Sequence, residues 1–212
     1  MKNIWLWRHG QTDYNVNQRV QGQVDIPLNT VGTQQAQAAA AMLRQRLGGA
    51  SPVIVSSDLQ RAAATAAELA RLTGVEIGFD PRLRERSFGP WEGHTRQEME
   101  VQWPREYAVW RAGGEPEGIG VETKAAVGQR VLSAVEQHTA QLEPGQVLVV
   151  VSHGSAITQG LVRMLGLDHE GRSPIRGLDN CHWSEVGLRS APANWVLLAH
   201  NLGANTTRLH RA

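Results

Sequence analysis

The sequence predicts an α/β protein in which helices cover both faces of a central, mainly parallel sheet. Three short runs of apolar β-branched, aromatic and Leu residues support this, at residues 4–7, 53–55 and 147–151. None of them alternates between apolar and polar residues, which is typical of strands that are buried on both faces. Helix-forming segments separate the runs, and this alternation indicates a parallel sheet. We therefore expect a three-layer sandwich.

Four segments have the composition of helices. They are rich in Ala, Gln, Arg and Leu, and Gly or Pro follows several of them. We expect helices over residues 33–47, 59–72, 124–141 and 156–165. Asp58 is the expected N-cap of the second helix. Shorter, peripheral strands are expected at residues 75–77 and 195–198.

Residues 89–122 interrupt the alternation of strands and helices. They contain three of the seven tryptophans, Trp91, Trp103 and Trp110, together with several Gly and Pro residues. A connection of this length in a compact domain is more often functional than a plain loop. We expect a single domain over residues 1–212, in which this segment forms a lid-like insertion that covers the site.

Composition and charge argue against several classes of partner. The formal net charge of +1 shows no basic or acidic excess that would favour nucleic acid or an anionic membrane. No apolar run approaches the roughly 20 residues of a membrane helix, and the early first strand leaves no room for a signal peptide. The single cysteine, Cys181, cannot form an intrachain disulfide. We expect a cytoplasmic protein with no nucleic acid or membrane partner; a homodimer stays open.

Polar side chains follow each of the three apolar runs. Arg8 and His9 follow the first run, Arg61 comes soon after the second, and His153 follows the third. Ligands of open α/β sheets bind outside the carboxyl ends of the strands, so these side chains should converge. Arginine suits contact with phosphate oxygens, and histidine can act as nucleophile or proton carrier. The sequence thus predicts a site that binds and transfers phosphate.

Five segments form an ordered set of motifs that spans most of the chain. They are residues 8–15 (RHGQTDYN), 21–28 (QGQVDIPL), 56–62 with 65–66 (SSDLQRA, TA), 83–93 (LRERSFGPWEG) and 152–154 (SHG). The first resembles the R-H-G-[EQ]-T-x-x-N signature of the histidine phosphatase superfamily, which includes the phosphoglycerate mutases, and the others follow in that family's order. An ordered set is far more specific than one tripeptide.

The resemblance implies a role for each polar residue of the predicted site. His9 would attack phosphorus and become a phosphohistidine, and Glu85 would protonate the leaving oxygen and then activate water. The other residues implied in catalysis are Arg8, Arg61 and His153. The residues implied in phosphate binding are Arg8, Asn15, Gln21, Gly22, Arg61, His153 and Gly154. The resemblance implies neither a metal ion nor a cofactor.

Elementary electrostatics agrees with this division of roles. Phosphoryl transfer depends mostly on positioning and on stabilising the charge of the equatorial oxygens, which positive donors supply. Two arginines beside His9 should lower its pKa and leave a ring nitrogen free to attack. Asp58, Glu92 and Glu122 are alternatives to Glu85 by position alone, and only the surrounding motif selects Glu85.

Other chemistries fit the residues less well. His9, His153 and Glu85 have the ligand types of a catalytic zinc centre, but two arginines would repel the cation and no H-E-x-x-H spacing occurs. No G-x-S-x-G elbow of a serine hydrolase occurs either. Two alternatives stay open: a mutase dependent on 2,3-bisphosphoglycerate, and a phospho-ligand binder without catalysis. Residues 85–93 resemble the phosphatase branch, and we favour hydrolysis.

The expected substrate is a small phosphorylated acid or sugar. The sequence is notably similar to actinobacterial phosphatases that act on glucosyl-3-phosphoglycerate, and this likeness is strongest in the first thirty residues. The likeness weakens in the insertion, where the family's usual G-G-E-S is replaced by Gly-Gly-Glu-Pro at residues 113–116.

The remaining histidines divide into two groups. His182 lies in a segment that resembles a late family strand near the pocket, and it could orient a site residue. The histidines expected on the surface or in loops are His94, His138, His169, His200 and His210.

Overall fold

The computed structural model describes residues 1–167, 171–190 and 193–203 and contains one six-stranded sheet in the order β3-β2-β4-β1-β5-β6. The strands are β1 (Lys2–Arg8), β2 (Ser51–Ser56), β3 (Ile77–Phe79), β4 (Gln146–Ser152), β5 (Trp183–Ser190) and β6 (Ala193–Leu202). The first four strands are parallel to their neighbours among themselves, whereas β5 pairs antiparallel with both β1 and β6. The mainly parallel sheet that the sequence predicts is confirmed.

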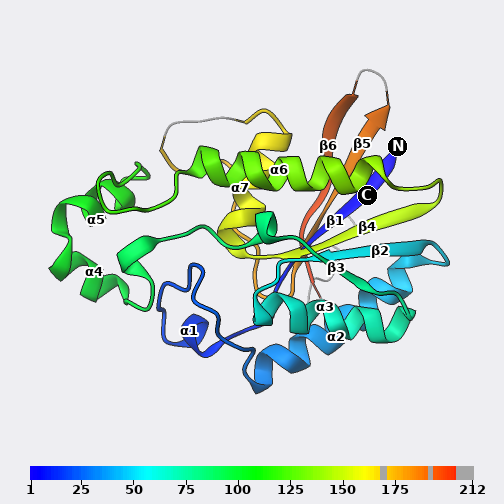
Figure 1. Cartoon of the computed structure of the whole chain (residues 1–212), viewed down its shortest axis with the longest axis horizontal. Coiled ribbons are helices and arrows are strands. Elements are labelled where there is room, and N and C mark those ends of the chain that lie inside the picture. The colour runs from blue at the N-terminus through cyan, green and yellow to red at the C-terminus, as the bar shows by residue number, and fades with distance from the viewer. Residues whose placement is uncertain (168–170, 191–192, 204–212) are drawn as a thin grey trace, which may run out of the picture.

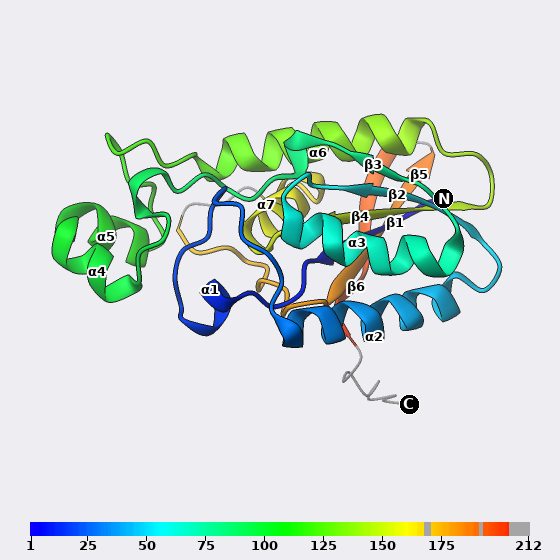
Figure 2. The same ribbon diagram turned by 60° about the horizontal axis from the view of Figure 1, so that its bottom comes forward.

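Helices cover both faces of this sheet (Figure 1). The helices are α1 (Asp13–Val16), α2 (Thr30–Leu47), α3 (Gln60–Thr73), α4 (Arg96–Gln102), α5 (Pro104–Arg111), α6 (Lys124–Ala140) and α7 (Gly154–Met164), with 3-10 turns η1 (Pro81–Leu83) and η2 (Gly89–Trp91). Helices α2 and α3 pack on one face, and α6 and α7 pack on the other (Figure 2). The predicted three-layer sandwich is therefore correct.

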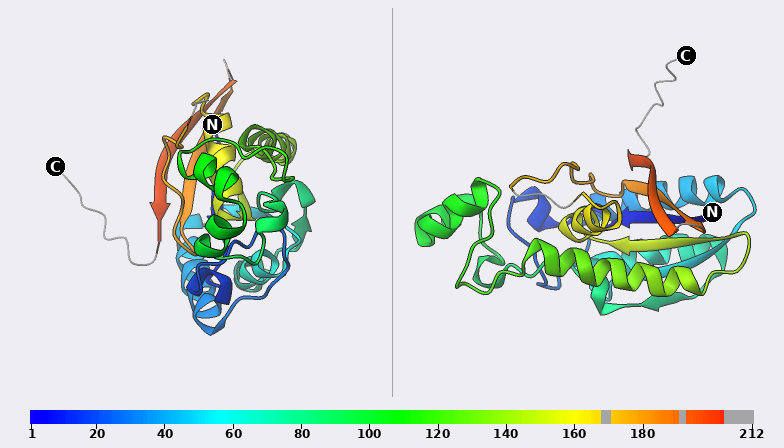
Figure 3. Two further views of the ribbon diagram at one scale, coloured as in Figure 1. Left: turned by 90° about the vertical axis from the view of Figure 1, so that its left-hand side faces the viewer. Right: turned by 90° about the horizontal axis from the view of Figure 1, so that it is seen from above.

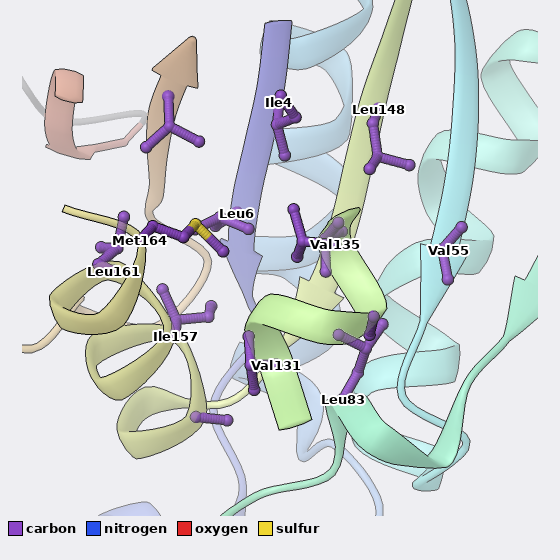
Figure 4. Packing of buried hydrophobic residues seen from close by; sticks show 14 of the residues in the cluster. Ile4, Leu6, Val55, Leu83, Val131, Val135, Leu148, Ile157, Leu161 and Met164 are labelled. Carbon is purple, nitrogen blue, oxygen red and sulfur yellow. The ribbon is translucent and has the colours of Figure 1, made fainter. Parts of the chain in front are cut away.

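The packing of β1 on both of its faces explains why its sequence is apolar at consecutive positions. Ile4 and Leu6 belong to the core beneath α6 and α7, whereas Trp5 and Trp7 belong to the core beneath α2 and α3. Figure 4 shows Leu6 beside Met164 of α7, with Ile4 farther along the same strand. Because successive side chains of a strand point to opposite faces, a strand covered on both faces needs apolar residues throughout.

The four long helices lie where the sequence predicts them, with ends shifted by a few residues. One detail was wrong: Asp58 is not the N-cap of α3. Leu59 occupies that position without a side-chain cap, and Asp58 instead accepts hydrogen bonds of 2.7 and 2.5 Å from Arg84. The charge of Arg84 offers the carboxylate a stronger, bidentate partner than the backbone amides do.

Strand β5 was not predicted from its composition. Its sequence includes Ser184 and Glu185, yet both residues are buried. Glu185 pairs with Arg46 of α2 and accepts a hydrogen bond from the Trp183 indole. A carboxylate is tolerated in such a strand only because a distant residue supplies its counter-charge.

The described histidines outside the predicted site have structural partners. His138, on α6, bonds the Asp80 carboxylate at 3.0 Å, and His94 lies in a loop against the Trp103 ring. His200 departs from expectation because it lies half-buried in strand β6, where it bonds Ser184 at 2.8 Å. His169 and His210 lie outside the described residues.

Residues 89–122 fold into η2, α4 and α5 and extend beyond the carboxyl ends of β1 and β4 (right panel of Figure 3). A small core of Trp91, Met99 and Tyr107 holds them together. No helix in the described parts of the chain has the length and apolar character needed to span a membrane.

Candidate active site

The carboxyl ends of β1 and β4 bring two histidines together. His9 follows β1, and its backbone N–H donates to the Ser152 carbonyl at 3.0 Å, which ties the end of β1 to the end of β4. His153 follows β4 directly. The two rings lie with their centroids 5.1 Å apart, so the sheet topology produces the predicted convergence.

The hydrogen bonds of His9 fix its tautomer. Its Nδ1 lies 2.7 Å from the Gly10 carbonyl oxygen, which can only accept, so Nδ1 carries the proton and Nε2 has a free lone pair. The ring is 2% exposed. Burial, and then the charges of Arg8 and Arg61, hold the pKa of His9 well below its usual range. The ring is thus a neutral potential nucleophile.

Arg61 is fully buried at the first turn of α3. Its Nη1 donates to the Val24 carbonyl and its Nη2 to the Gly22 carbonyl, both at 2.8 Å. Gly22 has a φ of +50°, and a Cβ there would lie 2.1 Å from the Glu92 carboxylate. Both the positive φ and the contact with Glu92 favour glycine at this position of the loop.

Arg8 and His153 complete a set of donors at the same place. Arg8 Nη1 donates to the Leu178 carbonyl at 2.5 Å, and His153 Nε2 lies 2.9 Å from Ser57 Oγ. Three buried nitrogens of this site nevertheless have no partner within the described part of the chain: Nε of Arg8, Nε of Arg61 and Nδ1 of His153. Unpaired buried polar groups are costly, and a bound anion would satisfy the two guanidinium N–H groups.

Glu85 lies at the start of helix α7. Its Oε1 accepts from the Ala156 N–H at 2.8 Å and its Oε2 from the Ser155 N–H at 3.1 Å. Arg130 donates to the Glu85 carbonyl at 3.0 Å and fixes the backbone that presents this side chain. These bonds hold both side-chain oxygens of Glu85 at the N-terminus of α7.

A cavity of about 400 Å³ opens onto these groups. It is lined by Arg8, Tyr14, Asn15, Gln18, Arg19, Val20, Gln21, Gly22, Glu85, Phe88, Arg96, Trp110, Gly154, Ser155, Gly177 and Leu178. Six of the predicted site residues are in this lining, whereas His9, Arg61 and His153 are buried side chains. Among the described residues, Glu85 is the one carboxyl group that lines the cavity, which separates it from the three alternatives in the sequence.

Those alternative carboxylates have other partners. Asp58 pairs with Arg84, and Glu92 accepts from the Phe88 N–H. Glu122 pairs with Arg130. Within the described residues, no group of three His, Cys, Asp or Glu side chains could hold a metal ion.

Asn180 is a contact of the site that sequence reasoning missed. Its side-chain N–H₂ donates to the His9 carbonyl at 3.1 Å and to Asn15 Oδ1 at 3.2 Å. Occupying Oδ1 of Asn15 leaves that side chain its donor end for a ligand. The neighbouring His182 instead bonds the Asn201 carbonyl through its ring.

Replacing Asn180 by Ala should lower kcat about tenfold while changing KM by less than twofold. The reason is that the change removes the hydrogen bonds that hold His9 and Asn15 in position. The control is His182→Gln, which alters the adjacent ring that bonds Asn201. Steady-state kinetics and a thermal melt measure both variants. Equal losses of kcat in the two variants, or a loss that follows thermal stability alone, would contradict a positioning role.

The lowered pKa values of His9 and His153 predict that the fold loses stability in mild acid. Burial is the main cause that lowers both pKa values, and nearby positive charges lower them further. Below about pH 6.5 these two histidines therefore bind protons in the unfolded chain but stay neutral in the folded protein. The free energy of unfolding should therefore fall from pH 7.5 to 5.5, and less steeply in His153→Gln. Urea titrations measure it. An equal slope in both proteins would contradict neutral, buried rings.

Comparison with known proteins agrees with this geometry. Residues 4–202 match the model of the histidine phosphatase superfamily, branch 1. A glucosyl-3-phosphoglycerate phosphatase of Mycobacterium tuberculosis is 36% identical over 202 residues, which cover 91% of this chain and 88% of the relative. A probable phosphoglycerate mutase of Yersinia enterocolitica is 34% identical over 204 residues, which cover 93% and 91% of the two chains.

A solved structure of a mycobacterial glucosyl-3-phosphoglycerate phosphatase with VO3 superposes with a TM-score of 0.84 at 35% identity, over 95% of this chain and 99% of that one. The chain belongs to the histidine phosphatase superfamily. It is an enzyme of the phosphatase type, as the resemblance in its motifs implies.

Proposed function

We propose that this enzyme hydrolyses a small phosphorylated acid through a phosphohistidine formed on Nε2 of His9. The observation that carries the proposal is the neutral His9 ring, which donates from Nδ1 to Gly10 beside the guanidinium groups of Arg8 and Arg61. A neutral nitrogen next to fixed positive charge suits attack on a phosphoryl group, whose negative oxygens those charges attract. His9 and the anion-binding groups thus serve one reaction.

The first step transfers the phosphoryl group to the protein. Nε2 of His9 forms a bond to phosphorus while the bond from phosphorus to the ester oxygen breaks. Arg8 and Arg61 stabilise the equatorial oxygens through the Nε–H groups that have no partner in the described structure. Asn15 adds a neutral donor, and His153 contacts the phosphoryl group from the end of the neighbouring strand β4. Gln21, Gly22 and Gly154 shape the surrounding wall.

Glu85 acts as general acid in the first step and as general base in the second. It gives a proton to the leaving ester oxygen and later removes one from the water that attacks phosphorus, after which the bond to Nε2 breaks and phosphate leaves. Its place in the cavity wall, where the described residues offer no other carboxyl group, supports this role. No metal ion or cofactor has a step in this scheme.

An unpaired cation in the cavity supports an acidic substrate. Arg96 lines the cavity and makes no hydrogen bond or ion pair with any described residue, whereas Arg19 is paired with Glu98. A guanidinium group binds carboxylates well. A phosphate ester with a carboxylate would satisfy it, and a phosphoglycerate derivative such as glucosyl-3-phosphoglycerate has both groups.

A mutase dependent on 2,3-bisphosphoglycerate is the second candidate, since some relatives are named as probable phosphoglycerate mutases. A mutase must protect its phosphohistidine from water and rebind the product in a second orientation. Residues 85–93 instead resemble the phosphatase branch, and η2 follows Glu85 after only three residues. We therefore propose hydrolysis as the main reaction.

Release of phosphate in excess EDTA tests the proposal. The substrates are 3-phosphoglycerate, glucosyl-3-phosphoglycerate and glycerol 3-phosphate, which lacks the carboxylate. We expect release by the wild type, faster from the two acids, and none by His9→Ala. Interconversion of phosphoglycerates without release would favour the mutase, and binding without turnover would favour a phospho-ligand binder.

Location and assembly are part of the same proposal. The enzyme is expected in the cytoplasm, which agrees with a free, buried Cys181. A homodimer stays open as the assembly state, and light scattering would decide it by comparing the mass in solution with that of the 23.2 kDa chain.

A further inference from the structure

Three aromatic side chains border the cavity in addition to the phosphate-binding groups. Tyr14 comes from α1, Phe88 from the segment before η2, and Trp110 from α5. We call these three residues the aromatic wall. All three are half-buried, so each ring has part of its surface packed and part accessible. The catalytic roles described above use none of them.

Two rings of the aromatic wall, those of Trp110 and Phe88, pack against other side chains of the protein. Trp110 packs edge-on against Trp91 with centroids 5.9 Å apart, and it contacts Tyr107 at 5.8 Å. The Arg86 guanidinium lies 5.3 Å from the centroid of Phe88. Such packing restricts rotamers before any ligand arrives, which lowers the entropic cost of binding. The fully buried Trp91 serves as packing for the insertion, whereas Trp110 borders the cavity.

A polar side chain, that of Gln18, lies in the cavity lining together with the aromatic wall. Gln18 lines the same cavity with a φ of 53°, a left-handed conformation that is uncommon for a residue other than glycine. Its exposed side-chain amide makes no hydrogen bond to the described residues. An amide offers both a donor and an acceptor, and strained backbone is often retained where a side chain must be presented to a ligand.

We propose that the aromatic wall and Gln18 form a subsite for a sugar ring on the leaving group. The inference rests on the proposed function and assigns residues to the part of the substrate that does not react. A sugar ring has an apolar C–H face, which packs on aromatic rings, and hydroxyl groups at its edge, which bond to a side-chain amide. Binding energy from this ring can be used to orient the phosphate at His9.

Specificity constants for paired esters test the subsite. The measured quantity is the ratio of kcat/KM for glucosyl-3-phosphoglycerate to kcat/KM for 3-phosphoglycerate. We expect a ratio above one in the wild type and a fall of about tenfold in both Trp110→Ala and Gln18→Ala, since each loses contacts to the ring alone. Phe88→Leu gives the same test if Trp110→Ala does not fold. The control is Trp103→Phe, in the same insertion but outside the cavity wall.

Phenyl phosphate distinguishes a sugar from any apolar ring. A sugar subsite predicts that Gln18→Ala weakens turnover of the glucosylated ester more than that of phenyl phosphate. Wall variants that affect only phenyl phosphate would overturn the sugar assignment. A wild-type ratio near one that no variant changes would overturn the subsite and leave the proposed hydrolysis intact. Failure of the wild type to hydrolyse any of the esters would instead contradict the proposed function.

Discussion

Replacing His9 by Asn is expected to lower kcat at least about 10⁴-fold, because the reaction loses its nucleophile and no described group can take its place. Asn retains a side-chain N–H that can donate toward the Gly10 carbonyl, which His9 contacts at 2.7 Å. The fold should therefore persist, and phosphate should still bind to the variant. Phosphate release and binding of inorganic phosphate, measured by calorimetry, check the two halves of this expectation.

His200→Gln is the matched control. That histidine is half-buried and bonds Ser184 and the Arg176 carbonyl, but it lies outside the cavity. Its variant should keep the wild-type kcat within about twofold, as expected for a change remote from the chemistry. Equal loss in the two variants, or appreciable turnover by His9→Asn, would contradict nucleophilic catalysis by His9.

Replacing Glu85 by Gln should lower kcat by about 10²- to 10⁴-fold on an alkyl phosphate such as 3-phosphoglycerate, the range usual for a lost general acid. An aryl ester with a good leaving group, 4-nitrophenyl phosphate, needs less help from a proton in the first step. Its first turnover should therefore survive better, and a burst of nitrophenol should precede slow hydrolysis of the phosphoenzyme. Stopped-flow absorbance measures the burst.

Glu117→Gln is the control for charge, since Glu117 is exposed in the insertion and outside the cavity wall. It should behave as the wild type on both esters. An equal loss on alkyl and aryl esters in Glu85→Gln, with no burst, would show that Glu85 supports structure through Ser155 and Ala156 rather than proton transfer.

The position of the phosphate site could be predicted from sequence because few topologies fit the apolar runs. Parallel strands that end in Arg8-His9 and in His153 must present those residues at one edge of the sheet, and the structure has them there. The insertion was also recognisable by its length. The capping box of α4, Thr95 with Glu98, is a further local signal of a helix start in the sequence.

Other features depend on contacts between distant residues and could not be predicted. The backbone carbonyls of Val24 and Gly22 each accept one N–H from a terminal nitrogen of Arg61, and the Nε–H has no partner among the described residues. Asn180 reaches His9 across 171 positions of sequence. No local propensity encodes such contacts, because they arise only when the chain has folded.

The most direct test of phosphohistidine catalysis is to locate the phosphoryl group on the protein during turnover. Enzyme mixed with 4-nitrophenyl phosphate is quenched in alkali within milliseconds, digested, and analysed by mass spectrometry. We predict one phosphoryl group on the peptide that contains His9, at higher occupancy in Glu85→Gln and absent in His9→Asn. Phosphate release with no phosphorylated His9 at any time, or phosphorylation at His153 instead, would contradict the account.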